Sequence, residues 1–569
     1  MFRHGVIVLA VVSALAHTGA ALSIPSSQET SGEREAAIAA TAGQIFNTKR
    51  TFSIAGVQYP FYDGPVNSPG SLTLQIQNEE LQKLITFRST QPQSVVSIAT
   101  TAAATLTNVD AITNLYTLAE SIIEKPMAMD NSDETFGLQR LTHKSFALRL
   151  ATPSDLKGAE ISLTDSQLAE KCGKNVTPKT LVASNRLFVD DFSDAAQWND
   201  PARPEKYAPN VVGFFCFNKD SQKLLPIEIR YPDTKLAYTP YDTADEWTLA
   251  KMGLEAASVQ YHQMAHMGET HTLTIPMRVE MLRNMAEQHP VRALLMHHVY
   301  ADFALEMQVA VILLNTTTML DQTFAWGASG STRFLGNHIN TKVSFKNDFV
   351  SDYTKRGLQH IPTHKYVQYG KLYQETIHEF VASFLNVYYA TDAAVVADKE
   401  LQNWAKATVA NVAQLKDFPS SFPTKAALAD TLTHVIFLCT VRHHGMNGMA
   451  TWHSMTVPYS PAALWKPLPT AKLQKDEKLN LREYTVPTAV IPVALALGAT
   501  FFRPVPEAES MLAAYTTSPF SDESRLEQSI KAFRTNLQTI DAAITAGEKN
   551  EKWPYEVLRP SRLSHYTWV

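Results

Sequence analysis

Residues 261–271 read YHQMAHMGETH. His266 and His271 are five residues apart, so on an ideal α-helix of ~3.6 residues per turn their side chains point about 140° away from each other. The two imidazoles can converge only if the turn between them is widened to the i→i+5 pattern of a π-bulge, which recurs at functional sites. Gly268 lies between them and lowers the cost of such a distortion. The stretch therefore predicts a helix with a local π turn that presents two imidazoles to one point.

A second stretch, residues 441–450, reads VRHHGMNGMA. His443 and Asn447 are four residues apart and project from the same face of a helix. Neutral imidazoles and an amide oxygen suit a divalent first-row metal such as Fe(II) or Mn(II), and the lack of a thiolate argues against a structural zinc site. A chain with 18 histidines also places several on helix faces by chance, and we interpret five as structural: His262, His289, His297, His298 and His444.

The last residues, 553–569, read WPYEVLRPSRLSHYTWV. Most C-terminal segments fray in solvent, whereas this proline-bounded aromatic and aliphatic run is typical of a buried one. A buried α-carboxylate is costly unless a cation or a set of donors compensates it. The carboxylate of Val569 is therefore a candidate metal ligand. The alternative is a tail strand that docks on the surface.

Further motifs accompany these stretches in a regular order. Trp247, Ala250 and Lys251 precede the His262-Gln263 pair, residues 289–298 read HPVRALLMHH, residues 388–404 read YYATDAAVVADKELQNW, and residues 467–470 read PLPT. With these motifs in this order, residues 140–569 resemble the catalytic domain of the lipoxygenases.

The resemblance implies a ligand set and a substrate pocket. The implied metal ligands are His266, His271, His443, the weaker amide ligand Asn447 and the carboxylate of Val569, with water or hydroxide in the sixth position. The metal-bound hydroxide would be the catalytic group. Leu313 would clamp the reacting carbon of the substrate, and Val309 would influence the position and face of oxygen attack. Leu320 would line the same pocket.

The chain also departs from the usual lipoxygenase pattern. The spacing from the His262-Gln263 pair to His266 is one residue shorter than usual, and Glu306, Ala310 and Ala450 replace the usual Asn, Arg and Gln. The chain also has an N-terminal signal, and the segment after it is too short for an N-terminal β-barrel. With these features and the short spacing, the chain is most similar to the secreted fungal manganese lipoxygenases. We therefore expect one manganese ion, with non-haem iron as the alternative, since both ions accept nearly the same ligands.

Apolar periodicity predicts a mainly α-helical fold with a few short strands. Long helical patterns cover residues 294–320, 373–389, 426–449 and 524–545, and residues 224–230 are typical of a strand. We expect a signal peptide over residues 1–22, an N-terminal extension over 23–139 that is part of the catalytic fold, and the catalytic domain over 140–569. The extension lacks the repeated alternating strands of the N-terminal β-barrel (PLAT) domain found in plant and animal lipoxygenases.

The composition and the N-terminal residues limit which partners and which location we expect for the protein. A net charge of −5 with mixed signs gives no support for nucleic-acid binding. Arg3 and His4 precede an apolar run over residues 6–16, which is typical of a secretory signal and too short for a stable membrane span. We expect a secreted, extracellular monomer. Of its three cysteines, Cys172 and Cys216 can pair, and Cys439 is typical of a buried thiol.

The function that the resemblance implies is dioxygenation of polyunsaturated fatty acids. A hydrogen atom leaves a bis-allylic carbon of a 1,4-diene such as that of linoleate or α-linolenate, O2 adds, and a fatty-acid hydroperoxide forms. One alternative is a hydroperoxide isomerase of the same fold. Another is a non-catalytic secreted lipid-binding relative, although such a protein has no need for five metal ligands.

Overall fold

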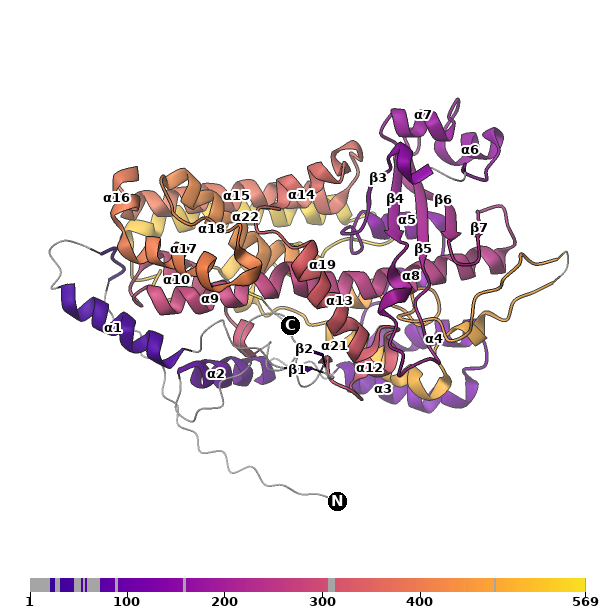
Figure 1. The fold of residues 1–569 in the computed structure, drawn as a ribbon, viewed down its shortest axis with the longest axis horizontal. Coiled ribbons are helices and arrows are strands. Elements are labelled where there is room, and N and C mark those ends of the chain that lie inside the picture. The colour runs from indigo at the N-terminus through magenta and orange to yellow at the C-terminus, as the bar shows by residue number, and fades with distance from the viewer. Residues whose placement is uncertain are drawn as a thin grey trace, which may run out of the picture.

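The computed structural model describes residues 21–25, 31–45, 53–54, 57–58, 72–86, 91–156, 160–304, 313–447, 449–474 and 477–567. Within them the fold is mainly α-helical, as predicted (Figure 1). The first helices along the described part of the chain are α1 (Ser31–Gln44), α2 (Leu72–Thr86), α3 (Gln91–Ala102), α4 (Val109–Leu118), α5 (Asp133–Arg140), α6 (Asp165–Cys172) and α7 (Pro178–Ala183).

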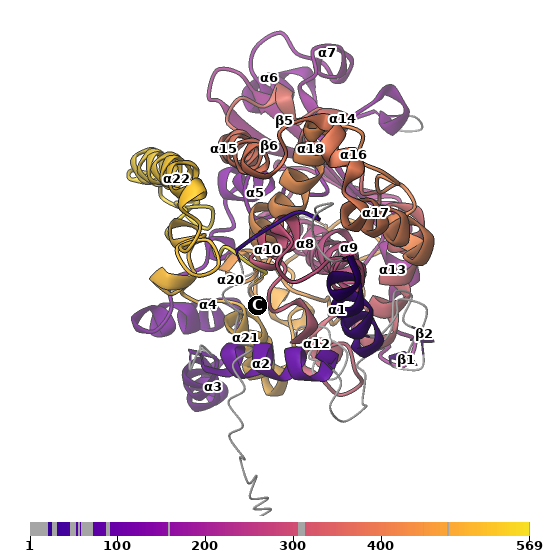
Figure 2. The same ribbon diagram turned by 90° about the vertical axis from the view of Figure 1, so that its left-hand side faces the viewer.

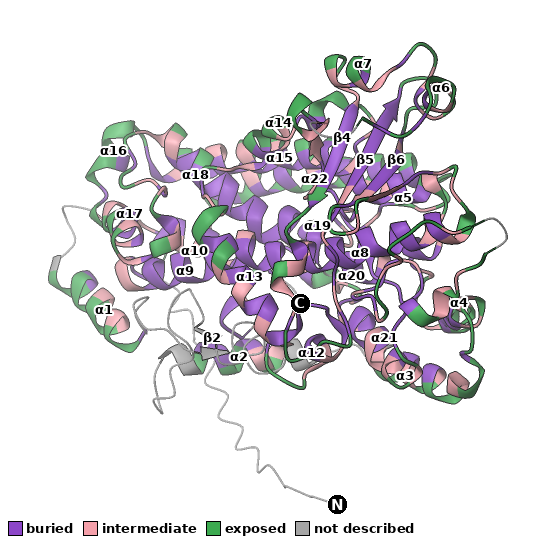
Figure 3. Ribbon diagram, turned by 45° about the vertical axis from the view of Figure 1, so that its right-hand side comes forward, coloured by how far each residue is buried: buried purple, intermediate pink, exposed green. Residues whose placement is uncertain are grey.

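The centre of the fold is one long helical run. It comprises α8 (Ala244–His266), a π turn (Met267–His271) and α9 (Thr272–Asn284). Thr243 and Glu246 form a capping box that starts α8. The run is buried along nearly its whole length, and the other helices surround it in the end-on view (Figures 2 and 3). The π turn predicted from the histidine spacing is confirmed.

A second helical run crosses the first and also contains a π turn. It comprises α18 (Lys425–Phe437), the π turn Leu438–Arg442 and α19 (His443–Met446). A threonine in each π turn donates its hydroxyl to a carbonyl oxygen of the preceding helix: Thr270 donates to His266 at 2.5 Å, and Thr440 donates to Ile436 at 2.7 Å. A π turn interrupts the regular i→i−4 hydrogen bonds of an α-helix, so the threonine hydroxyls supply partners for the carbonyl groups beside the turn.

The remaining helices pack around these two runs. α15 (Lys365–Tyr388) packs against α18 and against α22 (Glu527–Glu548), and α1 and α17 (Lys399–Asn411) pack on α9. The others are α10 (Pro290–Met296), α12 (Met319–Thr323), α13 (Gly327–Thr341), α14 (Phe349–Lys355), α16 (Asp392–Ala397), α20 (Met449–Ser454) and α21 (Ile491–Thr500). No helix in the described ranges has both the length and the apolar character needed to span a membrane.

Most helical ranges predicted from periodicity are confirmed, but residues 294–320 are not one helix. α10 ends at Met296, and Ala301 has a left-handed φ of 72° that interrupts the helical path. Neighbouring groups hold this bend: Arg278 donates to the carbonyl of Val299 at 3.0 Å, and Glu80 accepts from the backbone of Phe303 at 3.1 Å.

The principal sheet is antiparallel, with its strands paired in chain order. It comprises β3 (Arg149–Leu150), β4 (Leu187–Phe192), β5 (Val211–Asn218), β6 (Lys223–Tyr231) and β7 (Leu236–Tyr238). The predicted strand at 224–230 is confirmed as part of β6. A disulfide joins Cys172 of α6 to Cys216 of β5, and Cys439 is a buried thiol. Before α5 the described residues form helices and the hairpin of β1 (Ser53–Ile54) and β2 (Val57–Gln58) rather than a β-barrel.

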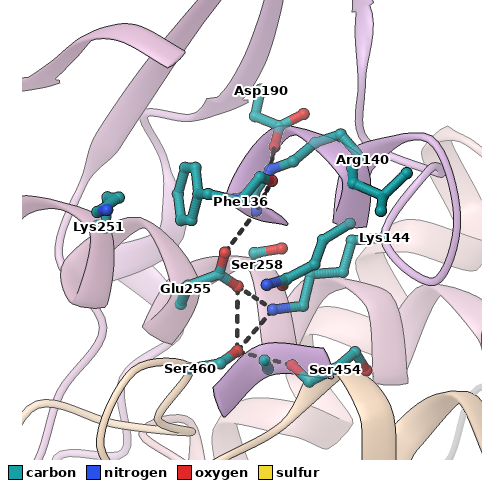
Figure 4. Close-up of polar contacts among 12 residues, drawn as sticks. Phe136, Arg140, Lys144, Asp190, Lys251, Glu255, Ser258, Ser454 and Ser460 are labelled. Carbon is teal, nitrogen blue, oxygen red and sulfur yellow. Dashed lines mark hydrogen bonds and ion pairs between the residues drawn. The ribbon is translucent and has the colours of Figure 1, made fainter. Parts of the chain in front are cut away.

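A buried network of charges attaches α5 to the central run (Figure 4). Arg140 contacts Asp190 of β4 at 3.0 Å and Glu255 of α8 at 2.5 Å. Lys144 also pairs with Glu255 and donates to the hydroxyl of Ser460 at 2.6 Å. Burial alone would raise the pKa of Glu255, but Arg140 and Lys144 lower it further than burial raises it. The network therefore holds an ionised carboxylate at the middle of α8.

Candidate metal centre

Three buried imidazoles meet where the two helical runs cross. His266 immediately precedes the first π turn, His271 is the last residue of that turn, and His443 is the first residue of α19. The Nε2 atom of His271 is 3.1 Å from the Nε2 atoms of both His266 and His443. One ligand atom from each of the three residues lies within 4.8 Å of the others. The structure thus brings together the three predicted imidazoles.

The imidazoles have the protonation state that a metal ligand needs. Burial lowers the pKa of His271 to about 3 and holds the pKa values of His266 and His443 well below the ordinary value for histidine. Nδ1 of His266 lies 3.1 Å from the carbonyl oxygen of Gln263 and donates to it, which leaves the lone pair on Nε2. The triad therefore consists of neutral rings whose Nε2 atoms face one another.

This arrangement fits a transition-metal ion. Two imidazole nitrogens bound at roughly 2.1 Å on adjacent corners of a coordination polyhedron are about 3 Å apart. The observed separations of 3.1 Å match that value. The donor set, which contains no thiolate, suits iron or manganese better than a structural zinc ion.

Asn447 lies next to the triad. Its side-chain nitrogen is 3.1 Å from Nε2 of His266, and its side-chain oxygen accepts from the hydroxyl of Thr451 at 3.1 Å. Rotating the amide by 180° exchanges the two atoms, and the Thr451 hydroxyl can then accept instead of donate. The residue can thus present its oxygen to an ion without losing its own hydrogen bond.

The chain's last residues, Trp568 and Val569, lie outside the described residues, so the predicted carboxylate ligand stays a prediction. The tail is described up to Thr567, which is buried. The backbone of Thr567 donates to the carbonyl of His298 at 3.2 Å, and Nδ1 of His298 bonds the carbonyl of His565 at 2.5 Å. The tail therefore docks on the segment that follows α10. We interpreted His298 as structural, and it anchors the tail.

A largely apolar cavity adjoins the triad. Leu313 and Leu320 line it together with His266, His271 and Asn447. Val309 lies outside the described residues. Sequence reasoning missed six apolar lining residues: Met264, Met267, Phe324, Met455, Leu497 and Phe501. The uncharged run of α21 was the available signal for the last two, but periodicity alone does not show which face meets the cavity.

An ion pair joins the two π turns. Glu269 of the first turn pairs with Arg442 of the second, and Glu269 also contacts Nε2 of His338 at 2.9 Å. Burial raises the pKa of Glu269, but Arg442 and His338 lower it to well below the usual range. The carboxylate is therefore ionised and holds the two ligand-bearing turns together. Nothing in the sequence indicated this ion pair.

Comparison with known proteins agrees with the site. The family profile described as Lipoxygenase matches residues 134–557. The manganese lipoxygenase of Colletotrichum gloeosporioides (strain Cg-14) is 28% identical over 355 residues, which cover 60% of this chain and 57% of that protein. The manganese lipoxygenase of Gaeumannomyces avenae is 29% identical over 371 residues, which cover 62% of this chain and 58% of that protein. Each alignment thus spans less than two thirds of the relative's length.

The solved structures extend the likeness of the fold to nearly the whole chain. A structure named manganese lipoxygenase superimposes with a TM-score of 0.84 at 21% identity, covering 97% of this chain and 100% of that chain. A structure of the manganese lipoxygenase of Gaeumannomyces graminis superimposes with a TM-score of 0.82 at 23% identity, covering 96% and 100%. The predicted similarity to manganese lipoxygenases is confirmed. Since the profile matches well over half of the chain, this chain belongs to the lipoxygenase family.

Proposed function

We propose that this chain is a metal-dependent dioxygenase that converts polyunsaturated fatty acids with a 1,4-diene into hydroperoxides. The observation that carries the proposal is the junction of three neutral, buried imidazoles with a pocket whose lining is largely apolar. The apolar lining of this pocket suits an acyl chain. Linoleate and α-linolenate are the substrates that we expect.

The residues that would hold the metal are His266, His271, His443, Asn447 and the carboxylate of Val569. We propose manganese, with iron as the alternative, and the support for manganese is the name of the relatives that match this chain. The chemistry that either ion supplies is one-electron redox chemistry, which permits removal of a hydrogen atom from a bis-allylic carbon.

The work of the chain itself is to bind and orient the substrate. Leu313, Leu320 and Phe501 supply apolar walls that exclude water from the acyl chain. Because these walls also contain His266 and His271, an acyl chain in the cavity lies directly beside the triad. Hydrogen transfer depends steeply on distance, so this confinement is the contribution of the protein to the rate.

We also propose that the protein is secreted, is cleaved after the signal at residues 1–22 and functions as a monomer. The disulfide between Cys172 and Cys216 supports an oxidising compartment, since such bonds are rare in reducing ones. Mass spectrometry of protein from the culture medium of an expressing cell tests this part. An uncleaved chain found only inside the cell would contradict it.

The test of the reaction is incubation of the purified full chain with linoleate in an oxygen electrode, followed by product chromatography. We expect equimolar uptake of O2 and formation of a conjugated-diene hydroperoxide. His443→Ala should abolish both, whereas His444→Ala should retain them, because His444 bonds the carbonyl of Thr440 through Nδ1 and lies outside the triad. Conversion of a preformed hydroperoxide under nitrogen, without oxygenation of linoleate, would identify an isomerase instead. Binding of linoleate without turnover of either substrate would identify a lipid-binding protein.

A further inference from the structure

A carboxylate stands behind one of the three imidazoles. Oδ1 of Asp302 is 3.7 Å from Nδ1 of His271, and the Asp302 side chain is fully buried. Nδ1 of His271 is also buried, and it makes no hydrogen bond within the described part of the chain. The two groups therefore face each other on the side of the ring opposite the triad.

Asp302 is held in place from the N-terminal helix α2. Glu80 of α2 accepts hydrogen bonds from the backbone of Phe303 and of Ala304, each at 3.1 Å, and pairs with Arg278 at 2.7 Å. Arg278 in turn donates to the carbonyl of Val299. Residues on both sides of Asp302 are thus fixed by groups that are themselves buried.

The local charge also favours a cation at the triad. Glu80, Arg278 and Asp302 contribute two carboxyl groups and one guanidinium to a region that is closed to solvent. An ion held by the imidazoles would offset the surplus of acidic groups.

His266 and His271 differ in the group that faces the Nδ1 atom of each ring. His266 has the carbonyl of Gln263 as the acceptor for its Nδ1 proton, at 3.1 Å. His271 has Asp302, and a decrease of less than about 1 Å in their separation gives a charge-assisted hydrogen bond. A carboxylate behind a ligand imidazole fixes its tautomer and raises its basicity more than a carbonyl does.

We propose that Asp302 is a positioning residue for the metal site: it accepts the Nδ1 proton of His271 and thereby turns the Nε2 lone pair toward the ion. This inference rests on the proposed metal site.

The test compares Asp302→Asn and Asp302→Ala with Asp190→Asn in the full chain. Asp190 is a matched control because it is a buried carboxylate beside a guanidinium, that of Arg140, and has no contact with the triad. Metal retention is measured by elemental analysis after dialysis against graded chelator. The electron paramagnetic resonance spectrum of bound Mn(II) and the melting temperature of the metal-free protein are measured in parallel.

We expect both Asp302 variants to lose metal affinity by about 10- to 100-fold. Their Mn(II) spectrum should change while the metal-free melting temperature stays within the range of the Asp190→Asn control. Retention and a spectrum equal to those of the unmodified chain in both Asp302 variants would overturn the inference. A separate outcome, an unmodified chain that binds no metal or a His271→Ala variant that keeps it, would overturn the metal site itself.

Discussion

Leu313 is the first described residue after the segment that contains Val309. It is partly buried, packs against the main core and lines the cavity beside His266 and His271. A branched side chain at this place limits how far a bound acyl chain can move. Its effect should therefore fall on the distance over which hydrogen is transferred rather than on binding.

Leu313→Ala is expected to lower kcat by roughly 100-fold, because a displacement of about 1 Å in a reacting group has an effect of that size. KM should change much less. Val309→Gly should instead change the ratio of product regioisomers more than the rate. Steady-state kinetics on linoleate, with chiral chromatography of the products, measures both effects.

The control for Leu313 is Leu385→Ala in α15, a buried core leucine outside the cavity. It should cost about 2–5 kcal/mol of stability and leave kcat and product ratio unchanged for the folded fraction. An equal loss of kcat in both variants, or unchanged kinetics and products in Leu313→Ala, would show that Leu313 is an ordinary core residue.

Single residues were predictable where chemistry and spacing coincide. The i, i+5 spacing of His266 and His271 indicated a shared site, and the structure brings these two together with His443. Asp302 and Phe501 were missed because each reaches the site only through the packing of segments that lie far apart in the sequence. The bend at Ala301 brings Asp302 behind His271, and nothing in an Asp-Phe-Ala sequence indicates such a bend.

At the scale of elements, the two π turns are what bring the ligands together. Each widened turn shifts the helix that follows it, and each contains a threonine whose hydroxyl donates to a carbonyl of the preceding helix. The ion pair between Glu269 and Arg442 joins the turns directly. The site therefore depends on local features of two helices as well as on their crossing.

Thr440→Val is expected to lower the free energy of unfolding by about 1–3 kcal/mol, because it removes a buried hydroxyl that bonds the Ile436 carbonyl without changing the volume. Thr535→Val is the matched control: Thr535 makes the same bond to the carbonyl of Lys531, but on the exposed face of α22. Its effect should stay within about 0.5 kcal/mol. Chemical denaturation measures both, and equal effects would refute a special role of the hydroxyl in the π turn.

The first π turn was predictable because His266 immediately precedes it and His271 ends it. The second was not, since only His443 follows it and no earlier ligand in α18 gives a spacing to interpret. Apolar periodicity predicted one helix over residues 294–320, because the pattern contains no signal for the interruption at Ala301. Alanine favours helices, and the left-handed conformation of Ala301 is imposed by Arg278 and Glu80 on its neighbours.

At the scale of the whole molecule, the fold buries many histidines in neutral form. Burial lowers the pKa of His298 and of His364 to about 3, and that of His434 to about 4. In the unfolded chain these groups take up protons below about pH 6.5. The folded state then binds fewer protons than the unfolded state, so stability is complete above about pH 6.5 and falls as the pH decreases toward 4.

We expect each such histidine to cost about 1.4 kcal/mol per pH unit across this interval. His364→Asn should reduce the slope by that amount. His364 caps α15 by accepting from the backbone of Val367, and asparagine can do the same without titrating. Denaturation at a series of pH values between 6.5 and 4.5 tests this. An unchanged slope in the variant would show that His364 is protonated in the folded state.

The fold class followed from helical periodicity over long ranges, which sums many weak preferences and is therefore robust. How the N-terminal helices pack did not follow from it. α1 packs on α9 and α3 packs on α21, contacts between segments far apart in the chain (Figure 2). Such pairings depend on matching surfaces rather than on local pattern.

The most direct test of the central claim is the metal content of the purified full chain, measured by elemental analysis beside the variants His266→Ala, His271→Ala and His443→Ala. We predict about one manganese ion per chain in the unmodified protein and a small fraction of that in each variant, with His262→Ala unchanged as the control. A folded unmodified chain without a stoichiometric transition metal, or alanine variants that keep it, would contradict the account.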